Sequence, residues 1–402
     1  MRKLIRFRLS ILMFLEYFIW GAWYVTMGAY IFSNFNGDAV FVGSAYANLS
    51  IAAIISPIFI GLVADRYFPA QKVLGILHLL GAATLLCISN VSEANAFWWL
   101  ILLYTLLYMP TMALANSISF SQLQDASKDF PKIRVLGTVG WIAAGLLIGF
   151  MKIETDALTF RIAAIASLLL GVYSFSLPNT PPQRGGSTKL SVLLGLDAFQ
   201  LFRSRSFTVF FLSSVAICIP LSFYYSFTNS FLNNIGFENA AGKMTIGQAS
   251  EFVFMVLIPF FFRRLGVKKM LMIGIGAWII RYIFFACGNT GTNLWMLYAG
   301  IVLHGVCFDF FFVTGQIYTD NAAKDTNKSA AQGIITLATY GFGILIGSYI
   351  SGFVTEHYTN IVGGTKIYNW QSIWQVPALI AAVILLAFAT FFNDKNERQG
   401  KT

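Results

Sequence analysis

The sequence predicts an all-α membrane protein in which twelve transmembrane helices form two bundles of six. Hydrophobic residues make up 57% of the chain and charged residues only 11%, whereas a soluble domain carries roughly 25% charged residues. Apolar runs of about 20 residues, each able to cross about 30 Å of hydrocarbon as a helix, recur from end to end. The alternation of apolar and polar residues that a membrane β-barrel needs is absent, so helices are expected.

The first six runs occupy the N-terminal half. The chain opens with MRKLIRFRLS and ILMFLEYFIWGAWYV, which are basic and then apolar, as in a signal peptide. The apolar part is too long and lacks a clear small-residue cleavage site, so it is expected to remain as the first membrane helix. The six runs lie at about 8–32, 41–64, 73–90, 96–117, 131–151 and 158–177.

A polar segment separates these runs from the next six. Residues 178–206 are rich in Pro, Gly, Ser and basic residues, and we expect a cytoplasmic linker between an N-terminal bundle at 1–177 and a C-terminal bundle at 207–402. Within the linker, LLGLDAFQLF is expected to form a short interfacial helix. The remaining runs lie at about 207–231, 244–262, 270–288, 293–317, 331–355 and 373–392.

The two halves echo one another. DASKD separates the fourth and fifth runs, and DNAAKD separates the tenth and eleventh. DRYFPAQK follows the second run, and RRLGVKK follows the eighth, with both pairs spaced by close to half the chain. A parallel repeat of six helices is typical of secondary transporters that are built from two bundles around a midplane site.

The net charge of +10 reflects membrane topology rather than binding of nucleic acid. Most Lys and Arg residues fall in loops on the side shared by the two termini. By the positive-inside rule both termini are then cytoplasmic, and the basic side attracts anionic lipid. The loops of the other side carry only Lys152, Arg161, Lys243 and Lys366.

The cysteines predict neither disulfides nor a metal site. All four fall in apolar runs and none belongs to a CxxC pair. Small core residues are the expected role. They are Cys87, Cys218, Cys287 and Cys307.

Two acidic residues deep in the expected membrane spans are candidates for binding a proton or substrate. A charge at the bilayer centre costs about 3 kcal/mol, so it is rarely idle. Asp309 shares a helical stripe with Gly305, which leaves room beside the carboxylate, and Glu251 follows Gln248 by about one turn. Burial suits a carboxyl group that must take up and release a proton. A purely structural bond between helices is the alternative.

Arg134 lies close to the cytoplasmic end of the fifth run. It shares one face with Thr138 and Trp141. Snorkelling to lipid headgroups is an open alternative to a role in ligand binding. In the seventh run Ser222 and Tyr225 share a face, as ligand contacts or as packing residues.

Two further charges lie within the spans. Arg281, in AWIIRYIFF, has no polar neighbour one turn away, which favours a structural or lipid-facing role. Glu16 aligns with Trp20 and Trp23 on a face that is expected to point toward a cavity.

Several motifs resemble one family. FPKIRVLGTVGW, GLDAF, CFDFF, GLVADRY and NWQSIW are similar to segments of the nucleoside:proton symporters of the major facilitator superfamily. The resemblance implies twelve helices, alternating access and proton-coupled nucleoside uptake across the bacterial inner membrane, with substrate bound at the midplane between the two bundles. We also expect a monomer in the lipid bilayer, with no metal or other cofactor, driven by the proton gradient.

The resemblance assigns roles to individual residues. Asp309 and Glu251 would couple the proton, with Arg134 as the cation that biases them. GLVADR is similar to the superfamily's G-x-x-x-D-R loop, which implies a gating role for Asp65 and Arg66. The positions that match the family's binding site are Arg134, Thr138, Gln248, Glu251, Phe308 and Asp309.

This chain departs from the family pattern at the walls of the expected site. Trp141 stands where the family has Phe, His304 where it has Tyr, and Ser222 and Tyr225 where it has amides. Glu16 stands where the relatives carry Gln. The proton machinery is therefore expected to be retained while the preferred nucleoside differs.

The chemistry of a nucleoside fits these residues. Trp141 and Phe308 could stack on the flat base, while Glu251, Asp309 and Gln248 could bond the ribose hydroxyls.

Two other functions stay open. A sugar or polyol symporter would use the same fold and carboxylates. A polytopic membrane enzyme would need a catalytic constellation at a membrane face. The histidines His78, His304 and His357 lack an obvious acidic partner motif, so an enzyme is not expected.

Overall fold

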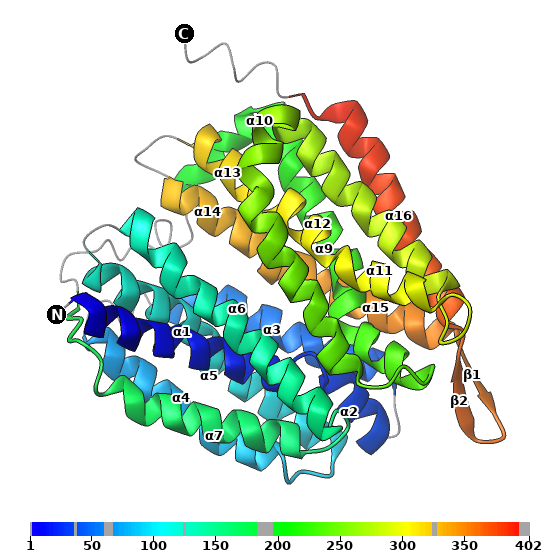
Figure 1. The fold of residues 1–402 in the computed structure, drawn as a ribbon, viewed down its shortest axis with the longest axis horizontal. Coiled ribbons are helices and arrows are strands. Elements are labelled where there is room, and N and C mark those ends of the chain that lie inside the picture. Colours follow the sequence, from blue (N-terminus) through cyan, green and yellow to red (C-terminus); the bar gives the residue numbers. More distant parts are fainter. Residues whose placement is uncertain are drawn as a thin grey trace. The chain divides into compact units, whose positions relative to one another are not determined.

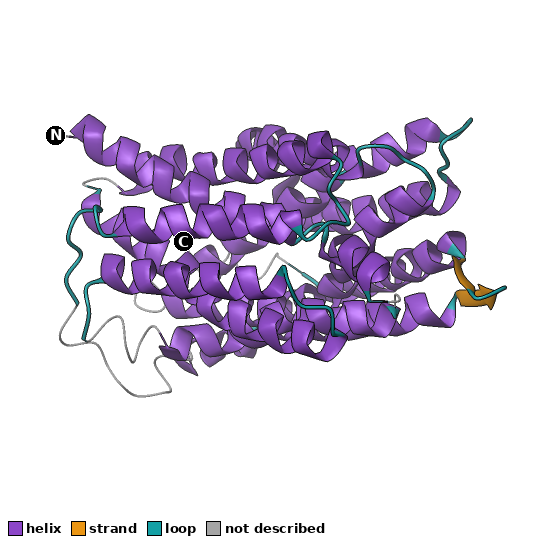
Figure 2. Ribbon diagram, turned by 90° about the horizontal axis from the view of Figure 1, so that it is seen from below, coloured by secondary structure: helices purple, strands orange, loops and turns teal. Residues whose placement is uncertain are grey.

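The computed structural model describes residues 2–35, 38–59, 67–123, 126–182, 196–323 and 328–393. Helices account for nearly all of the regular structure in this part of the chain, as Figure 2 shows. Each predicted apolar run overlaps a helical segment of the described residues. The all-α prediction is therefore confirmed.

The first half contains seven helices among its described residues. The first predicted run is interrupted at 24–26, which divides it into α1 and α2. The other five runs each give one helix. The bounds are α1 Arg2–Trp23, α2 Met27–Asn34, α3 Ala39–Phe59, α4 Ala70–Ile88, α5 Ala94–Gln122, α6 Ala126–Met151 and α7 Leu158–Ser174.

The second half begins with the short helix that the linker motif predicts, a 3₁₀ helix, η2, at Leu196–Arg203. The eighth and ninth runs form one long segment, α10, which is broken at Gly266 by a backbone with φ 71° and ψ 176°. Only glycine adopts this conformation at little cost. The seventh run forms α9 Arg205–Asn234, the eighth and ninth form α10 Ala240–Cys287, and the twelfth forms α16 Trp370–Phe391.

The tenth and eleventh runs each contain a π-helical stretch. These are η3 at Asp309–Val313 and η4 at Leu337–Gly343. A π stretch inserts a residue into the helical ladder and occurs often at functional sites. The α-helical parts of these runs are α11 Leu294–Val302, α12 His304–Phe308, α13 Thr314–Ala322, α14 Lys328–Thr336 and α15 Ile344–His357.

The helices are compatible with twelve membrane spans. Ten segments of the described residues are long and apolar enough to cross a bilayer. One of them, α10, contains two predicted runs, and α7 is a shorter apolar helix of 17 residues.

A β-hairpin that the sequence did not predict joins α15 to α16. Its strands, β1 Thr359–Val362 and β2 Thr365–Tyr368, pair antiparallel. Gly363 and Gly364 form the two-residue turn with φ 59° and 81°. Positive φ at both central positions matches the twist of a tight hairpin, which is why glycine is favoured there.

The chain divides into two compact units. Unit 1 comprises Met1–Gly37, Asn48–Leu193 and Asn239–Thr245, and unit 2 comprises Asp38–Ala47, Leu194–Glu238 and Ile246–Thr402. In unit 1, α1 packs on α6 and α7, and α4 packs on α5 and α7 (Figure 1). In unit 2, α9 packs on α15, α16 and η4. The predicted boundaries after 177 and before 207 stay a prediction.

Two glutamates bind the first turns of helices in equivalent ways. In unit 1, Oε1 of Glu154 accepts a hydrogen bond from the Ala241 N–H at the start of α10, over 3.0 Å. In unit 2, Oε2 of Glu356 accepts one from the Ala39 N–H at the start of α3, also over 3.0 Å. A carboxylate at a helix N-terminus satisfies an unpaired N–H and complements the helix dipole.

Candidate functional site

Unit 2 contains a row of charged and polar side chains inside the membrane spans. Arg281, on α10, is completely buried and donates from Nη1 to Nδ1 of His304 over 3.0 Å. The Nε2 atom of His304 lies 3.7 Å from Oε2 of Glu251. The row thus links Arg281 in the second half of α10, His304 on α12 and Glu251 in the first half of α10.

The contact with Arg281 fixes the tautomer of His304. A guanidinium only donates hydrogen bonds, so Nδ1 of His304 must accept with its lone pair. The ring hydrogen is then on Nε2, which faces Glu251. While Arg281 stays bonded, His304 has no free nitrogen that could take up a proton.

Aromatic rings surround this row. The Arg281 guanidinium lies over the Tyr224 ring, 3.6 Å from its centroid. His304 stacks on Tyr224 at 5.0 Å and contacts Phe308 at 5.9 Å. A desolvated cation over an aromatic face is held by about 2 kcal/mol. The lipid-facing interpretation of Arg281 is therefore wrong, because its side chain is buried among aromatic rings and a histidine.

Asp309 is the first residue of the π stretch η3. It is completely buried, and neither of its carboxylate oxygens has a hydrogen-bond partner among the described residues. An ionised carboxylate in such a place is costly, whereas a neutral carboxyl group costs far less. Binding or release of a proton at Asp309 would therefore change the local energy strongly.

A glycine brings the helices that carry these acidic residues together. A Cβ atom at Gly305 would lie 2.6 Å from the Glu251 nitrogen and from the Ser250 carbonyl. The Gly305 N–H also donates to the Ser250 hydroxyl over 3.0 Å. Gly305 was expected to leave room beside Asp309. The structure instead shows it leaving room for the backbone of α10 at Glu251.

The other predicted residues of unit 2 differ in exposure. Gln248 and Ser222 are buried, while Tyr225 and Phe308 are partly exposed. The Ser222 hydroxyl donates to the Cys218 carbonyl over 2.8 Å. This bond uses its only hydrogen, so toward a ligand the hydroxyl could act only as an acceptor.

In unit 1 the three predicted residues of α6 are partly exposed. These are Arg134, Thr138 and Trp141. The Arg134 guanidinium lies 4.0 Å from the ring centroid of Tyr17 on α1. Trp141 contacts Trp20 edge-on at 5.2 Å. Arg134 is therefore held against an aromatic ring of its own unit. The snorkelling interpretation did not predict this contact.

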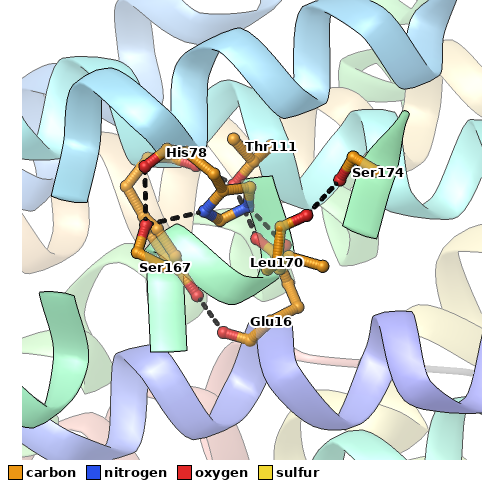
Figure 3. Close-up of polar contacts among 7 residues, drawn as sticks. Glu16, His78, Thr111, Ser167, Leu170 and Ser174 are labelled. Carbon is orange, nitrogen blue, oxygen red and sulfur yellow. Dashed lines mark hydrogen bonds and ion pairs between the residues drawn. The ribbon is translucent and has the colours of Figure 1, made fainter. Parts of the chain in front are cut away.

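Sequence reasoning missed a buried cluster in unit 1. Glu16 and His78 are almost completely buried, and their Oε2 and Nε2 atoms lie 2.9 Å apart (Figure 3). The Thr111 hydroxyl donates to Oε1 of Glu16 over 2.6 Å, and the Ser167 hydroxyl lies 3.1 Å from Nδ1 of His78. No local motif could reveal this pair, because 62 residues separate its members. Glu16 therefore points to polar partners within its own unit.

The predicted gating residues, Asp65 and Arg66, lie outside the described residues.

Comparison with known proteins identifies the family. The profile of the family described as "Nucleoside H+ symporter" matches residues 3–397. The chain belongs to this family. The chain is similar to YegT of Escherichia coli (strain K12), with 43% identity over 97% of this chain and 94% of that protein. The nucleoside permease NupG is 34% identical over 98% of this chain and 97% of that protein.

Solved structures agree with the family assignment. The crystal structure of the nucleoside transporter NupG superposes with a TM-score of 0.88 over 97% of this chain and 100% of that chain, at 34% identity. A crystal structure of a peptide transporter shares the fold alone, with a TM-score of 0.72 at 13% identity over 95% of this chain and 93% of that chain. The chain is a multi-pass membrane protein with the transporter fold of the major facilitator superfamily.

Proposed function

We propose that this protein is a proton-coupled nucleoside importer that works by alternating access. The observation that carries the proposal is Asp309, a completely buried carboxyl group that has no hydrogen-bond partner in the part of the chain that the structure describes. The chain belongs to the nucleoside H+ symporter family. Such a group can bind a proton on one side of the membrane and release it on the other. Glu251 is the second acidic residue of this site.

The substrate class is supported by the relatives and by the partly exposed aromatic residues. The names of the NupG and xanthosine permease relatives specify nucleosides, and the xanthosine permease is 34% identical over 97% of this chain and 96% of that protein. Trp141 and Phe308 offer faces on which a base could stack. Gln248 and Glu251 offer groups that could bond ribose hydroxyls. The placement of the nucleoside between the two units stays a prediction.

The proton gradient is the proposed source of energy. Moving one positive charge inward gains about 2.3 kcal/mol per 100 mV of membrane potential. No further cofactor is required in this proposal. We place the protein in the bacterial inner membrane as a monomer with both termini in the cytoplasm, as the distribution of Lys and Arg favours.

Uptake measurements test the proposal. The full chain would be reconstituted into liposomes and given radiolabelled adenosine, uridine or xanthosine under an imposed proton gradient. We expect accumulation that a protonophore abolishes and that unlabelled nucleosides inhibit, while free ribose or glucose does not. Equal uptake with and without the gradient would reject symport. Inhibition by the free sugars instead of the nucleosides would indicate a sugar symporter.

A further inference from the structure

The bonds around His78 fix where its ring hydrogens lie. The Ser167 hydroxyl donates to the His78 carbonyl oxygen over 2.9 Å, and a hydroxyl has only one hydrogen to give. The Ser167 oxygen, 3.1 Å from Nδ1 of His78, must therefore accept. Nδ1 carries a hydrogen in every state in which these two bonds persist.

One further hydrogen lies between His78 and Glu16. Their Nε2 and Oε2 atoms are 2.9 Å apart, and a hydrogen bond at this distance needs one hydrogen between them. That hydrogen is carried by the ring or by the carboxyl group. The pair has no net charge in either case.

Thr111 gives the cluster a second bonding pattern. Its hydroxyl lies 2.6 Å from Oε1 of Glu16 and 2.6 Å from the Tyr108 carbonyl oxygen. Without a hydrogen on Oε1, Thr111 donates to Glu16. With a hydrogen on Oε1, the shared hydrogen must be on Nε2 of His78, because a carboxyl group carries only one. Glu16 then donates to Thr111, and the hydroxyl turns to donate to Tyr108. A rotation of one hydroxyl therefore accommodates an added proton with every polar atom of the cluster still bonded.

The polar groups around the cluster come from three neighbouring helices. From α5, Tyr108 donates from its hydroxyl to the Glu16 carbonyl oxygen over 2.6 Å, and Tyr104 lies nearby. From α7 only Ser167 is bonded to the cluster. On α6 the cation of Arg134 lies over Tyr17 of α1 and interacts electrostatically with Tyr108. No charged side chain other than His78 is bonded to Glu16 in the described part of the chain.

Aromatic rings link the cluster to Trp141, which is a predicted ligand contact of unit 1. Trp20 follows Glu16 by about one turn of α1. Its ring lies 6.1 Å from Tyr108 and 5.2 Å from Trp141. The rings of Tyr108 and Trp20 therefore connect Glu16 to Trp141.

We propose that Glu16, His78 and Thr111 form a second proton-binding site, separate from Asp309 and Glu251, which takes up one proton on Oε1 of Glu16 during transport. The role in transport rests on the proposed function. Proton binding itself does not, and it is measured without any nucleoside.

Infrared spectroscopy tests the binding step. The purified full chain in lipid is compared between neutral and acidic pH, and we expect a carboxylic-acid C=O band to appear, or to shift if the shared hydrogen is already on Glu16, on acidification. Glu16→Gln should remove one such band, because its amide can donate to Nε2 of His78 and accept from Thr111 but cannot bind a proton. Asp309→Asn should leave that band in place. An unchanged difference spectrum in Glu16→Gln would overturn the proposal.

Thr111 variants test the hydroxyl switch without removing an ionisable group. Thr111→Ser keeps the hydroxyl and should keep the Glu16 band at the same pH. Thr111→Val removes the hydroxyl and with it both bonding patterns, so the pH at which the band appears should differ from that of the parent. Identical titration of the Glu16 band in Thr111→Val and Thr111→Ser would contradict the assigned role of Thr111.

The coupling ratio tests the role in transport. In proteoliposomes, the reversal potential of uridine-driven current gives the number of protons moved per nucleoside. We expect Glu16→Gln to move one proton fewer than the parent. An unchanged ratio would overturn the transport role. A Glu16 band without any nucleoside transport would reject the proposed function and leave the proton site intact.

Discussion

Arg281 donates from Nη1 to Nδ1 of His304 over 3.0 Å, and this contact directs the other ring nitrogen, which carries the hydrogen, toward Glu251. A buried arginine thus holds a histidine neutral beside an acidic residue. The arrangement separates two tasks that sequence alone could not assign. In the proposed function, His304 orients and packs, and the carboxyl groups of Glu251 and Asp309 bind the proton.

Replacing Arg281 should destabilise unit 2. Arg281→Lys keeps the positive charge but loses the flat guanidinium that lies over Tyr224 at 3.6 Å. We expect a loss of about 2 kcal/mol in the free energy of unfolding, the worth of a desolvated cation–π contact, seen as a lower thermal midpoint in detergent. Arg264→Lys is the matched control, because Arg264 lies over Phe260 at 4.2 Å in an exposed position. Equal falls of the thermal midpoint in the two variants would show that burial of Arg281 adds nothing to the stability of unit 2.

His304→Tyr should change affinity more than proton coupling. The bonded Nδ1 atom already prevents His304 from taking up a proton, so its loss removes no coupling group. The larger phenol changes the contacts with Tyr224 and Phe308. Competition assays with several nucleosides should show altered affinities, while accumulation against a gradient persists. Loss of accumulation with unaltered binding would assign the proton to His304 instead.

Asp309→Asn should abolish accumulation of nucleoside against its gradient. The amide has nearly the same shape but cannot bind and release a proton. Exchange of nucleoside down its own gradient should survive, since it needs no net movement of protons. Both modes are measured in the same proteoliposomes.

Glu251→Gln is the matched control for Asp309→Asn, because the two acidic residues could titrate as a coupled pair. Glu251 is partly exposed and lies near His304, whereas Asp309 is buried and has no hydrogen-bond partner within the described ranges. We expect the stronger coupling defect in Asp309→Asn. Uphill accumulation by that variant would remove Asp309 from the proton pathway.

Trp141→Ala should weaken nucleoside binding about tenfold or more, since stacking of a base on an aromatic ring contributes roughly 1–3 kcal/mol. Trp141→Phe should be milder, because a smaller aromatic face remains. Binding is measured by calorimetry on the purified protein. Trp99→Ala on α5 serves as the control, because its indole is exposed. Parent-like affinity of Trp141→Ala would exclude Trp141 from the binding site.

Gly305→Ala should disrupt the packing of α12 on α10. The new methyl group would lie 2.6 Å from backbone atoms of Ser250 and Glu251, so one helix must move. Overpacking of this kind costs about 1–3 kcal/mol, and both the thermal midpoint and uptake should fall. Gly276→Ala, in the same long segment as Glu251, is the control, because a Cβ there meets nothing within 4 Å. A fall of equal size in both variants would show that the close approach at Gly305 is unimportant.

The sequence by itself determined where the helices lie. Each predicted run overlaps a helical segment of the described residues, from α1 at Arg2–Trp23 to α16 at Trp370–Phe391. The reason is local: a backbone in lipid must bond within its own segment, so apolar length alone defines a span. The motifs around Arg134 and Asp309 also indicated the family correctly, because they are read within a few residues.

Only the tertiary structure decided which charges meet. Glu16 was expected to face a cavity, and the structural alternative for Arg281 named no partner. Each is bonded to a histidine on another helical element. The π stretch at Asp309 and the bonds of Ser222 were equally hidden from the sequence. Hydropathy predicts that a segment is a membrane helix, but it does not predict the rotation of that helix about its axis. That rotation is set by the packing of side chains from distant segments, and it selects the partner of every buried charge.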